Sequence, residues 1–576
     1  MTILPEKSGT PRALQQAGFA LLFSIAGPAW AQTVQSPSAT LWYGGPILTM
    51  AGDRPNMVDA VVERDGKIIY AGKVAQARKI AGTAAKEQNL GGATLLPGFV
   101  DAHSHFAMTM QVASGVDLQD PDHPISDIPS LIAALRTGIQ ARQIAPGGWV
   151  IAWQYDDAKL AEKRHITRAD LDAAFPDHKI VLIHFTGHGL VTNSAAMAAA
   201  GITDSTPNPP GGITLRDASG KLTGVFFENA AYPVYLKIPP LSPEQRRAAL
   251  AEAQRRYASN GFTHAQEGAA SLGDMDALLK AGAQGLIKLD LALLPTSQTL
   301  DNLLGRPDVR FGSYQGHVKL AGIKFVLDGS PQARTGYFTR PYANGAPDGH
   351  HPWHGTPNMS QEEFNADAAR AHGRGWQIFV HANGDAAIDM AIKGFDTLGL
   401  TKKTDARPVV IHSQFQRPDQ LAAYQRIGVG PAYFSNHTYY FADIHRSNFS
   451  ADVVGFISPF ASALKAGLHP SNHSDSPVTP LDPMTQLWSS MARQSKTGVV
   501  NGPDQRLTAW QGLHMLTTGP AWQVFEEKRK GQIKPGMLAD FVILDKNPLT
   551  TPLEAIRSIK IMRTVKEGQT IWSAGQ

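Results

Sequence analysis

The sequence predicts an α/β protein built around a (β/α)8, TIM-like barrel, with a small composite β-sandwich domain from both termini and an insertion, or cap, after the first barrel strand. Three observations predict this. The middle of the chain alternates apolar β-like runs with helical stretches, the pattern of parallel βα units. Eight of those runs end in polar residues or turn signals. Short alternating strands occur at both ends, and neither set can bury a core alone.

Composition narrows the class of protein. At 576 residues the chain suits a large barrel with additions. A hydrophobic content of 43%, a charged content of 18% and a net charge of +4 describe an ordinary globular protein and argue against a nucleic-acid partner. Cysteine is absent, which excludes disulfides, thiolate zinc sites and cysteine nucleophiles. A metal would therefore have to be bound by His, Asp, Glu or a modified Lys.

The first 31 residues are expected to be an export signal. Lys7 and Arg12 precede the short apolar run 18–27, and residues 29–31, Ala-Trp-Ala, form an A-x-A cleavage site. The expected location is periplasmic or secreted; a cytosolic N-terminal extension is the alternative. The apolar run is too short to span a bilayer, and no later segment qualifies, so no stable membrane anchor is expected.

The composite domain is predicted from residues 32–92 and 528–576. Asp65-Gly66 lies between two alternating runs and indicates a hairpin. Similar alternating runs occur near the C-terminus at 539–545, 559–565 and 568–572, and neither set of runs is large enough to bury a core alone. Pairing the two sets brings the termini together and leaves 93–527 as a single barrel unit.

The first barrel run, LLPGFVDAHSH at 95–105, ends in two histidines separated by one residue. Residues i and i+2 of a strand point to the same face, so His103 and His105 can converge on one point where the strand ends. This spacing favours a metal site. The plain alternative is a chance pair in a chain with 20 histidines.

The eight predicted strands continue along the chain. They end at His105, Glu267, Pro295, Asp328, Asn383, Gln414, Asn436 and Asp475. Between the first two lies a long stretch with β-like runs of its own at 148–153 and 179–184. An insertion of that length at the catalytic face, about 118–240, predicts a substrate cap.

Six residues on these strands are expected to meet at the barrel mouth: His103, His105, Lys324, His381, His412 and Asp475. Singly, each has an ordinary explanation: a hydrogen-bonded core histidine, a turn-capping aspartate or a snorkelling lysine. A lysine inside a buried strand is costly unless it is paired or chemically altered. Together, six such residues on barrel strands indicate a shared site.

Seven motifs carry a family resemblance. They are PGFVDAHSH (97–105), GHGLVTNS (187–194), GIKFVLDGS (322–330), VHANGDAAID (380–389), IHSQF (411–415), SDSPVTPLDPM (474–484) and KPGMLADFVILDKNPL (534–549). With these motifs the chain resembles the metal-dependent amidohydrolase superfamily, and its amidohydrolase 3 branch, the YtcJ-like hydrolases. The resemblance covers nearly everything after the signal and is specific for the branch but not for a substrate.

The resemblance implies a role for each residue of the set. His103 and His105 would bind the more buried metal, and His381 and His412 the second. Lys324 matches the lysine that bridges two metals when carboxylated. Asp475 matches the last-strand aspartate, a metal ligand and proton carrier. Two motifs depart from the pattern: Asn-His-Ser at 472–474 replaces the usual glycine and serine, and 187–194 varies the motif that contains His188.

The expected reaction is hydrolysis of a C–N bond of amide, formamide or N-acyl type. The expected cofactor is a pair of Zn²⁺ ions, with Mn²⁺, Fe²⁺ or Co²⁺ as substitutes. Metal-bound hydroxide would attack the carbonyl, because bound water falls in pKa from about 15.7 toward 7. Asp475 would take the proton and return it to the leaving nitrogen. Three alternatives stay open: a lactonase, esterase or isomerase on the same centre, a one-metal site with Lys324 unmodified, and a binding module without activity.

The substrate is expected to be a small molecule with an apolar or aromatic group. Aromatic residues gather near the cap and loops at Trp149, Trp153, Tyr155, Phe226, Phe227, Tyr433, Phe434, Tyr439 and Tyr440, although core packing is their commoner role. The candidates for substrate binding are Trp153, His188, Arg334 and His437. Whether the chain forms a homodimer is left open.

Overall fold

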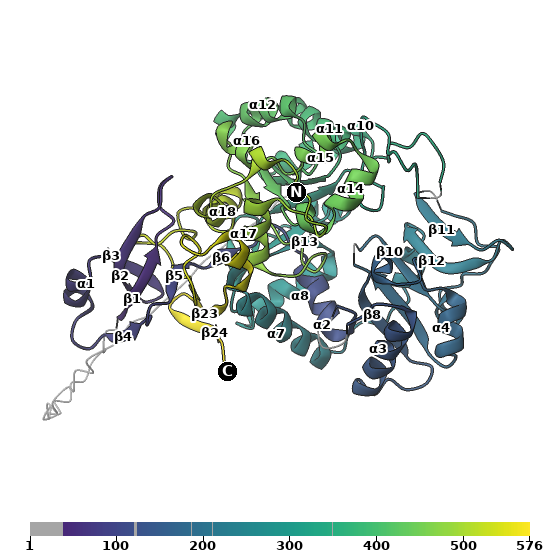
Figure 1. Cartoon of the computed structure of the whole chain (residues 1–576), viewed down its shortest axis with the longest axis horizontal. Helices are drawn as coiled ribbons and strands as arrows, with labels where there is room; N and C mark the ends of the chain where they lie inside the picture. Colours follow the sequence, from purple (N-terminus) through teal and green to yellow (C-terminus); the bar gives the residue numbers. More distant parts are fainter. Residues whose placement is uncertain (1–38, 120–123, 186, 210, 348, 576) are drawn as a thin grey trace, which may run out of the picture.

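The computed structural model of the chain describes residues 39–119, 124–185, 187–209, 211–347 and 349–575. The predicted export signal and its cleavage site lie outside these ranges. Figure 1 shows three parts: a sheet built from the two ends of the chain, a central barrel, and an inserted domain on the other side of the barrel. No helix in the described ranges is long and apolar enough to cross a membrane.

The two ends of the chain share one mixed eight-stranded sheet, consistent with the predicted β-sandwich domain. Its strands are β1 (Thr40–Leu48), β2 (Met57–Arg64), β3 (Lys67–Gly72), β4 (Lys86–Asn89), β5 (Thr94–Pro97), β22 (Phe541–Leu544), β23 (Ile561–Lys566) and β24 (Gln569–Ser573). Asp65-Gly66 forms the hairpin between β2 and β3. The pairing of β5 with β22 joins the two halves, with Leu96 opposite Val542.

The chain passes from this sheet into the barrel at Gly98. The sequence predicts one barrel strand over 95–105, but the structure divides that run. β5 pairs in the terminal sheet, and only β6 (Phe99–Val100) pairs in the barrel. A Cβ on Gly98 would lie 2.3 Å from Thr263 Cγ2, so a glycine is needed where the two sheets meet. The terminal sheet therefore extends to Pro97, beyond the predicted limit at residue 92.

Each of the eight predicted runs contributes one parallel strand to the barrel. The strands are β6, β13 (Phe262–Ala270), β14 (Asp290–Pro295), β17 (Gly322–Val326), β18 (Gln377–Ala382), β19 (Val409–His412), β20 (Gly430–Tyr433) and β21 (Ser471–Asn472). A bridge between Thr296 and Lys324 joins β14 to β17. The Asp475 amide donates to the His103 carbonyl at 3.0 Å, which closes the ring between its last and first strands. Two short strands, β15 (Tyr314–Gln315) and β16 (Val318–Leu320), extend the sheet beside β14.

Helices surround the barrel. The longer ones are α2 (Phe106–Ser114), α7 (Pro243–Ser259), α8 (Leu272–Ala283), α10 (Gln361–His372), α11 (Asp385–Thr397), α12 (Pro418–Ile427) and α17 (Pro483–Ala492). Helix α7 begins where it does because the Ser242 side chain accepts from the Gln245 amide and Pro243 fits the first turn. Its buried residues, Leu250, Ala253 and Tyr257, recur at helical spacing.

The insertion is a domain with its own core. Its six-stranded sheet is β7 (Val116–Asp117), β8 (Trp149–Tyr155), β9 (Lys179–His184), β10 (Gly189–Thr192), β11 (Gly212–Arg216) and β12 (Leu222–Glu228). Its helices are α3 (Ile128–Ala141), α4 (Arg168–Ala174), α5 (Ser194–Ala199) and α6 (Tyr232–Tyr235). Leu131 and Leu135 of α3 pack on Val150 and Ile180 of the sheet. These elements occupy the place in the chain where the cap was predicted.

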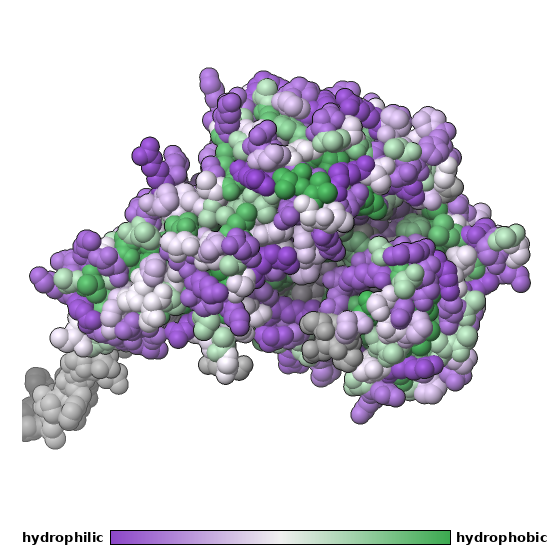
Figure 2. All heavy atoms as spheres, in the orientation of Figure 1, coloured by the Kyte–Doolittle hydropathy of each residue, from purple (hydrophilic) through white to green (hydrophobic). Residues whose placement is uncertain are grey.

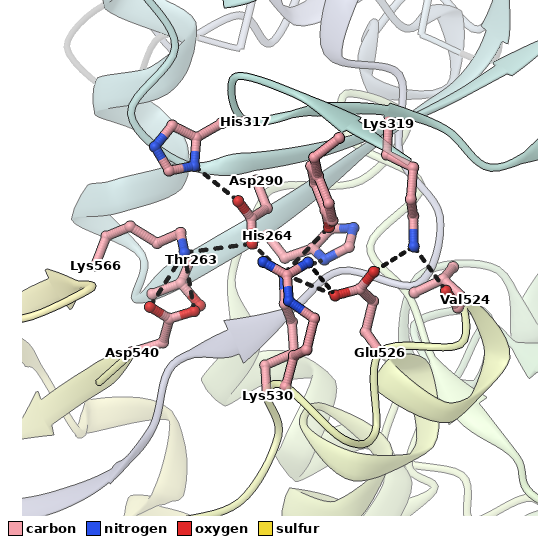
Figure 3. Close-up of polar contacts among 12 residues, drawn as sticks. Thr263, His264, Asp290, His317, Lys319, Val524, Glu526, Lys530, Asp540 and Lys566 are labelled. Carbon is pink, nitrogen blue, oxygen red and sulfur yellow. Dashed lines mark hydrogen bonds and ion pairs between the residues drawn. The ribbon is translucent and has the colours of Figure 1, made fainter. Parts of the chain in front are cut away.

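A buried charge network fixes the C-terminal part of the chain to the barrel, near the start of β14 (Figure 3). Asp290 contacts Lys530, and Lys566 Nζ lies 3.3 Å from Asp290 Oδ2 and 3.2 Å from Asp540 Oδ2. His317 Nδ1 lies 2.8 Å from Asp290 Oδ1. Burial alone would raise the pKa of Asp290, but the two lysine charges hold it well below its ordinary value.

Candidate metal centre

His103 and His105 lie in the loop after β6, not within a strand. Backbone hydrogen bonds fix this loop against the segment after β21. The Asp475 amide donates to the His103 carbonyl (3.0 Å), and the His105 amide donates to the Ser476 carbonyl (2.7 Å). The first and last strands of the barrel therefore bring both histidines to Asp475.

Both imidazoles point at the same carboxylate oxygen. His103 Nε2 lies 3.5 Å and His105 Nε2 lies 3.4 Å from Asp475 Oδ1. One potential ligand atom from each of the three residues lies within 4.8 Å of the others. This grouping suits a divalent cation.

The orientation of His103 is set from β13. His103 Nδ1 donates to Gln266 Oε1 at 2.8 Å, so Nε2 is the nitrogen that keeps a free lone pair. A Cβ on Gly268 would lie 2.1 Å from His103 Cε1, so any other residue there would displace the ring. Gln266 was not predicted from the sequence, where its only signal was its place one residue before Glu267 at the end of a predicted strand.

Lys324 lies in β17 and is almost completely buried. Its Nζ is 3.3 Å from His103 Nε2. Burial lowers the pKa of Lys324 to about 7. A large share of this amine is therefore uncharged at neutral pH.

His381 is the last residue but one of β18, and His412 ends the neighbouring strand β19. Their rings are in contact, with His412 Nε2 at 3.0 Å from His381 Nδ1. His381 Nε2 lies 3.0 Å from Asn383 Nδ2 and 3.5 Å from Asp328 Oδ1. Asp328, which the sequence analysis treated only as a strand end, is fully buried and accepts hydrogen bonds from three backbone amides.

His412 also connects His381 to the group formed by His103, His105 and Asp475. His412 Nδ1 lies 4.0 Å from Asp475 Oδ2. The structure thus connects the six predicted residues through short contacts, as two subsets that meet at Asp475. His103, His105 and Lys324 lie on one side, and His381 and His412 lie on the other.

The charges of the site favour neutral imidazoles around an ionised carboxylate. Burial lowers the pKa of His381 to about 3 and lowers the pKa values of His103 and His412 well below the ordinary range. Burial alone would raise the pKa of Asp475, but the imidazoles of His412, His105 and His103 hold it well below its ordinary value. Neutral imidazole and carboxylate are the forms that bind metal.

Two of these residues have unusual backbone conformations. His412 (φ 69°) and Asp475 (φ 52°) both occupy the left-handed region. Residues other than glycine rarely adopt it, and in folded proteins such strain is concentrated at functional sites. The surrounding hydrogen bonds therefore hold both side chains at the point where the strands end.

One further histidine belongs to this group. His473 is fully buried, and its ring centre lies 5.3 Å from that of His103 and 5.0 Å from that of His412. Burial lowers its pKa to about 3. In the sequence, His473 was apparent only as a departure from the family pattern.

The donor set fits a metal centre. His412 Nδ1 and Asp475 Oδ1 are buried and have no hydrogen-bond partner among the described residues. Buried polar atoms normally have partners, and a carboxylate facing three imidazoles without one is what a cation would satisfy. We therefore assign His103, His105 and Asp475, with Lys324, His381 and His412 beside them, as the residues that would hold it.

A cavity of about 610 Å³ lies between the insertion and the barrel loops. The surface in Figure 2 is hollowed between these two parts. Val478 and Thr479, which follow Asp475, line it from the barrel, and Glu228 lines it from β12. Its apolar lining consists mainly of Phe185, Ile213, Leu215, Phe227, Tyr440, Phe441, Ile444 and Pro480. The cap therefore forms one wall of a substrate-sized space beside the centre.

The four predicted substrate residues occupy different places. Arg334 lines the cavity, and its guanidinium donates to the Asn344 carbonyl at 2.9 Å. His188 is paired with the cavity residue Glu228 at 3.1 Å. Burial opposes protonation of His188, yet the Glu228 carboxylate raises its pKa above the ordinary value.

Trp153 and His437 do not line this cavity within the described part of the chain. Trp153 packs in the apolar core of the insertion with residues such as Val112 and Leu190. His437 is buried, and its Nδ1 lies 3.0 Å from His445 Nε2. Core packing and a histidine pair, the ordinary alternatives for such residues, account for both positions.

Comparison with known proteins gives consistent matches. The model described as "Amidohydrolase family" matches residues 86–572. YtcJ of Bacillus subtilis (strain 168) is 26% identical over 553 residues, covering 92% of this chain and 99% of that protein. N-substituted formamide deformylase of Arthrobacter pascens is 25% identical over 527 residues, covering 89% of this chain and 95% of that protein. Among solved structures, one match is the crystal structure of an uncharacterized metal-dependent hydrolase from Pyrococcus horikoshii OT3, which is 24% identical in sequence. The match covers 93% of this chain and 100% of that chain, and its TM-score of 0.72 shows a shared fold.

Proposed function

The chain belongs to the amidohydrolase family, and from this membership we propose that it is a metal-dependent hydrolase of C–N bonds of the amide, formamide or N-acyl type. One observation carries the proposal. Asp475 faces His103, His105 and His412, and Val478 and Thr479, which follow it in the chain, line a cavity of which the cap forms one wall. Imidazole and carboxylate donors next to a substrate-sized space are typical of a hydrolytic metal centre.

Zn²⁺ is the metal we propose for the centre, because imidazole ligands dominate it. When bound, such an ion lowers the pKa of water toward about 7 and polarises a carbonyl group. His103 and His105 would hold it with Asp475, and Gln266 would keep His103 in the tautomer that leaves Nε2 free.

Asp475 would carry the proton of the reaction. Its depressed pKa means that the carboxylate is ionised at neutral pH and can accept a proton from the attacking water. The same carboxyl group would then give the proton to the leaving nitrogen as the C–N bond breaks, because an amine leaves readily only when protonated. The reaction consumes one water and yields an acid and an amine.

Lys324 is proposed to be carboxylated. An uncharged lysine amine can add to carbon dioxide, forming an Nζ–C bond and releasing a proton. Burial of Lys324, which lowers its pKa to about 7, favours the uncharged amine that this requires. The product would supply two oxygen donors in place of the buried amine, whose Nζ lies 3.3 Å from His103 Nε2.

The substrate is proposed to be an N-substituted formamide or N-acyl compound with an apolar or aromatic substituent. The apolar lining of the cavity supports an apolar or aromatic substituent. The relative from Arthrobacter pascens is named for its action on N-substituted formamides, which supports this bond type. Arg334, Glu228 and the His188 beside it supply the polar groups at the wall.

A substrate panel tests this proposal. Zinc-loaded enzyme is assayed with N-benzylformamide, N-acyl amino acids and aryl amides, and in parallel with lactones and carboxylic esters of matched size. We expect kcat/KM to be highest for a C–N substrate with an aromatic substituent. Turnover of lactones or esters alone would overturn the C–N assignment while leaving the metal centre in place.

A further inference from the structure

His473 is the least explained residue of the centre. It follows β21 and lies two positions before Asp475, with its ring fully buried. Phe434 covers one face at a ring-centre distance of 4.6 Å. The other neighbours are His103 and His412, whose rings stand at 81° and 63° to it. A fifth imidazole thus lies directly beside two proposed metal ligands.

Neither ring nitrogen of His473 has a hydrogen-bond partner among the described residues. A neutral imidazole offers one donor and one acceptor, and burying both unpaired is costly. His445, another buried histidine nearby, is bonded through Nε2 to His437. A group that binds to an imidazole nitrogen would therefore stabilise the buried His473.

The spacing of the rings fits a shared cation. The ring centres of His103, His412 and His473 form a nearly equilateral triangle with sides of 5.5, 5.3 and 5.0 Å. Three imidazoles bound to one tetrahedral ion at Zn–N distances of about 2.0–2.1 Å would have ring centres roughly 5.2 Å apart. The ring centres thus have the spacing of ligands that share an ion, but the rings would have to turn to meet it, because in the described part of the chain the ligand atoms at this centre that lie within 4.8 Å of one another are those of His103, His105 and Asp475.

We propose that His473 is a further ligand of the metal centre and that it biases the centre toward Zn²⁺ or Co²⁺ and away from Mn²⁺. The proposal rests on the proposed function, because it needs the same centre to bind metal. Each added imidazole favours zinc and cobalt, whereas carboxylate and water ligands favour manganese. His473 would thus determine which metal the enzyme uses.

The test compares wild-type protein with His473→Gln and with His445→Gln as a matched buried-histidine control. Competition with a chelator gives the affinities for Zn²⁺ and Mn²⁺, and the cobalt-loaded proteins give visible absorption spectra. We expect His473→Gln to bind Zn²⁺ about 10- to 100-fold more weakly, with a smaller loss for Mn²⁺ and shifted cobalt bands. His445→Gln should retain wild-type affinities and bands.

A folded His473→Gln protein with wild-type zinc affinity and unchanged cobalt bands would overturn this inference alone. A wild-type protein that binds neither metal would overturn the proposed function as well. If His473→Gln does not fold, crystals of zinc-loaded wild-type protein decide the question. A His473 nitrogen at about 2.0–2.1 Å from zinc supports ligation, and a separation beyond bonding distance refutes it.

Discussion

At the scale of single residues, Asp475 is proposed to combine ligation with proton transfer, and one substitution separates the two roles. Asp475→Asn keeps an oxygen for weak ligation but cannot take and return a proton. Turnover should fall on the order of 10² to 10⁴ in steady-state kinetics, with partial metal loss. Asp482→Asn is the control, because Asp482 caps α17 and asparagine also caps helices. An Asp475→Asn enzyme with most of its rate would assign proton transfer to another group.

Lys324 allows a chemical rescue. Lys324→Ala should lose the carboxylated side chain and release at least one metal, which elemental analysis would detect. Propionate should enter the vacated space and restore part of the activity, because its two oxygens can replace those of the modified lysine. Lys324→Arg should not be rescued, since a fixed guanidinium charge fills the space. Full metal content in Lys324→Ala would instead show that Lys324 is not a metal ligand.

Much of the centre was predictable because its residues end apolar strands. His381 and His412 lie at or next to the ends of β18 and β19, and Lys324 lies inside an apolar run where a charged residue is conspicuous. His473 gave no such signal, since it stands in a polar stretch after a strand of two residues. Gln266 was missed because a glutamine in a strand has many ordinary roles, and only the fold shows that it orients His103.

At the scale of elements, all eight barrel strands were predicted, but the division of the first run was not. The run 95–105 is continuously apolar up to Asp101, so its periodicity cannot show that β5 and β6 belong to different sheets. Pro97-Gly98 was the available signal. Its meaning depends on Thr263, which is distant in sequence and near only in the folded chain.

Gly98 therefore provides a test of this junction. Gly98→Ala would place a Cβ 2.3 Å from Thr263 Cγ2, and we expect it to lower the free energy of unfolding by roughly 1–3 kcal/mol. Gly273→Ala is the matched control, because a Cβ in this turn of α8 meets nothing closer than 3.8 Å. It should be neutral or stabilise by up to about 1 kcal/mol. Urea unfolding of both variants measures the difference, and equal stabilities would contradict the proposed role of Gly98.

At the scale of the whole molecule, the buried network around Asp290 holds the C-terminal segment on the barrel (Figure 3). Asp290→Asn leaves Lys530 and Lys566 with less compensating charge, so the free energy of unfolding should fall by roughly 3–5 kcal/mol. Asp396→Asn breaks an exposed pair with Arg426 and should cost less than about 1 kcal/mol. Urea unfolding at neutral pH compares the two.

The same network predicts a pH dependence. The pKa of Asp290 is lower in the folded than in the unfolded chain, so its stabilisation is complete above the unfolded value of about 3.9 and is lost as the pH falls through the folded value. Wild-type stability should therefore decline more steeply below about pH 4 than that of Asp290→Asn. Parallel curves for the two proteins would show that Asp290 does not contribute in this way.

The central claim is that the ends of the first and last barrel strands bind the catalytic metal, and metal content tests it most directly. Elemental analysis is made on zinc-loaded wild-type protein, on the double variant His103→Ala, His105→Ala, and on a control, His178→Ala, His372→Ala, that removes two histidines elsewhere. We expect close to two ions per chain in the wild type and the control, and a loss of metal and of activity together in the double variant. Full metal occupancy in a folded His103→Ala, His105→Ala protein would contradict the assignment of the site.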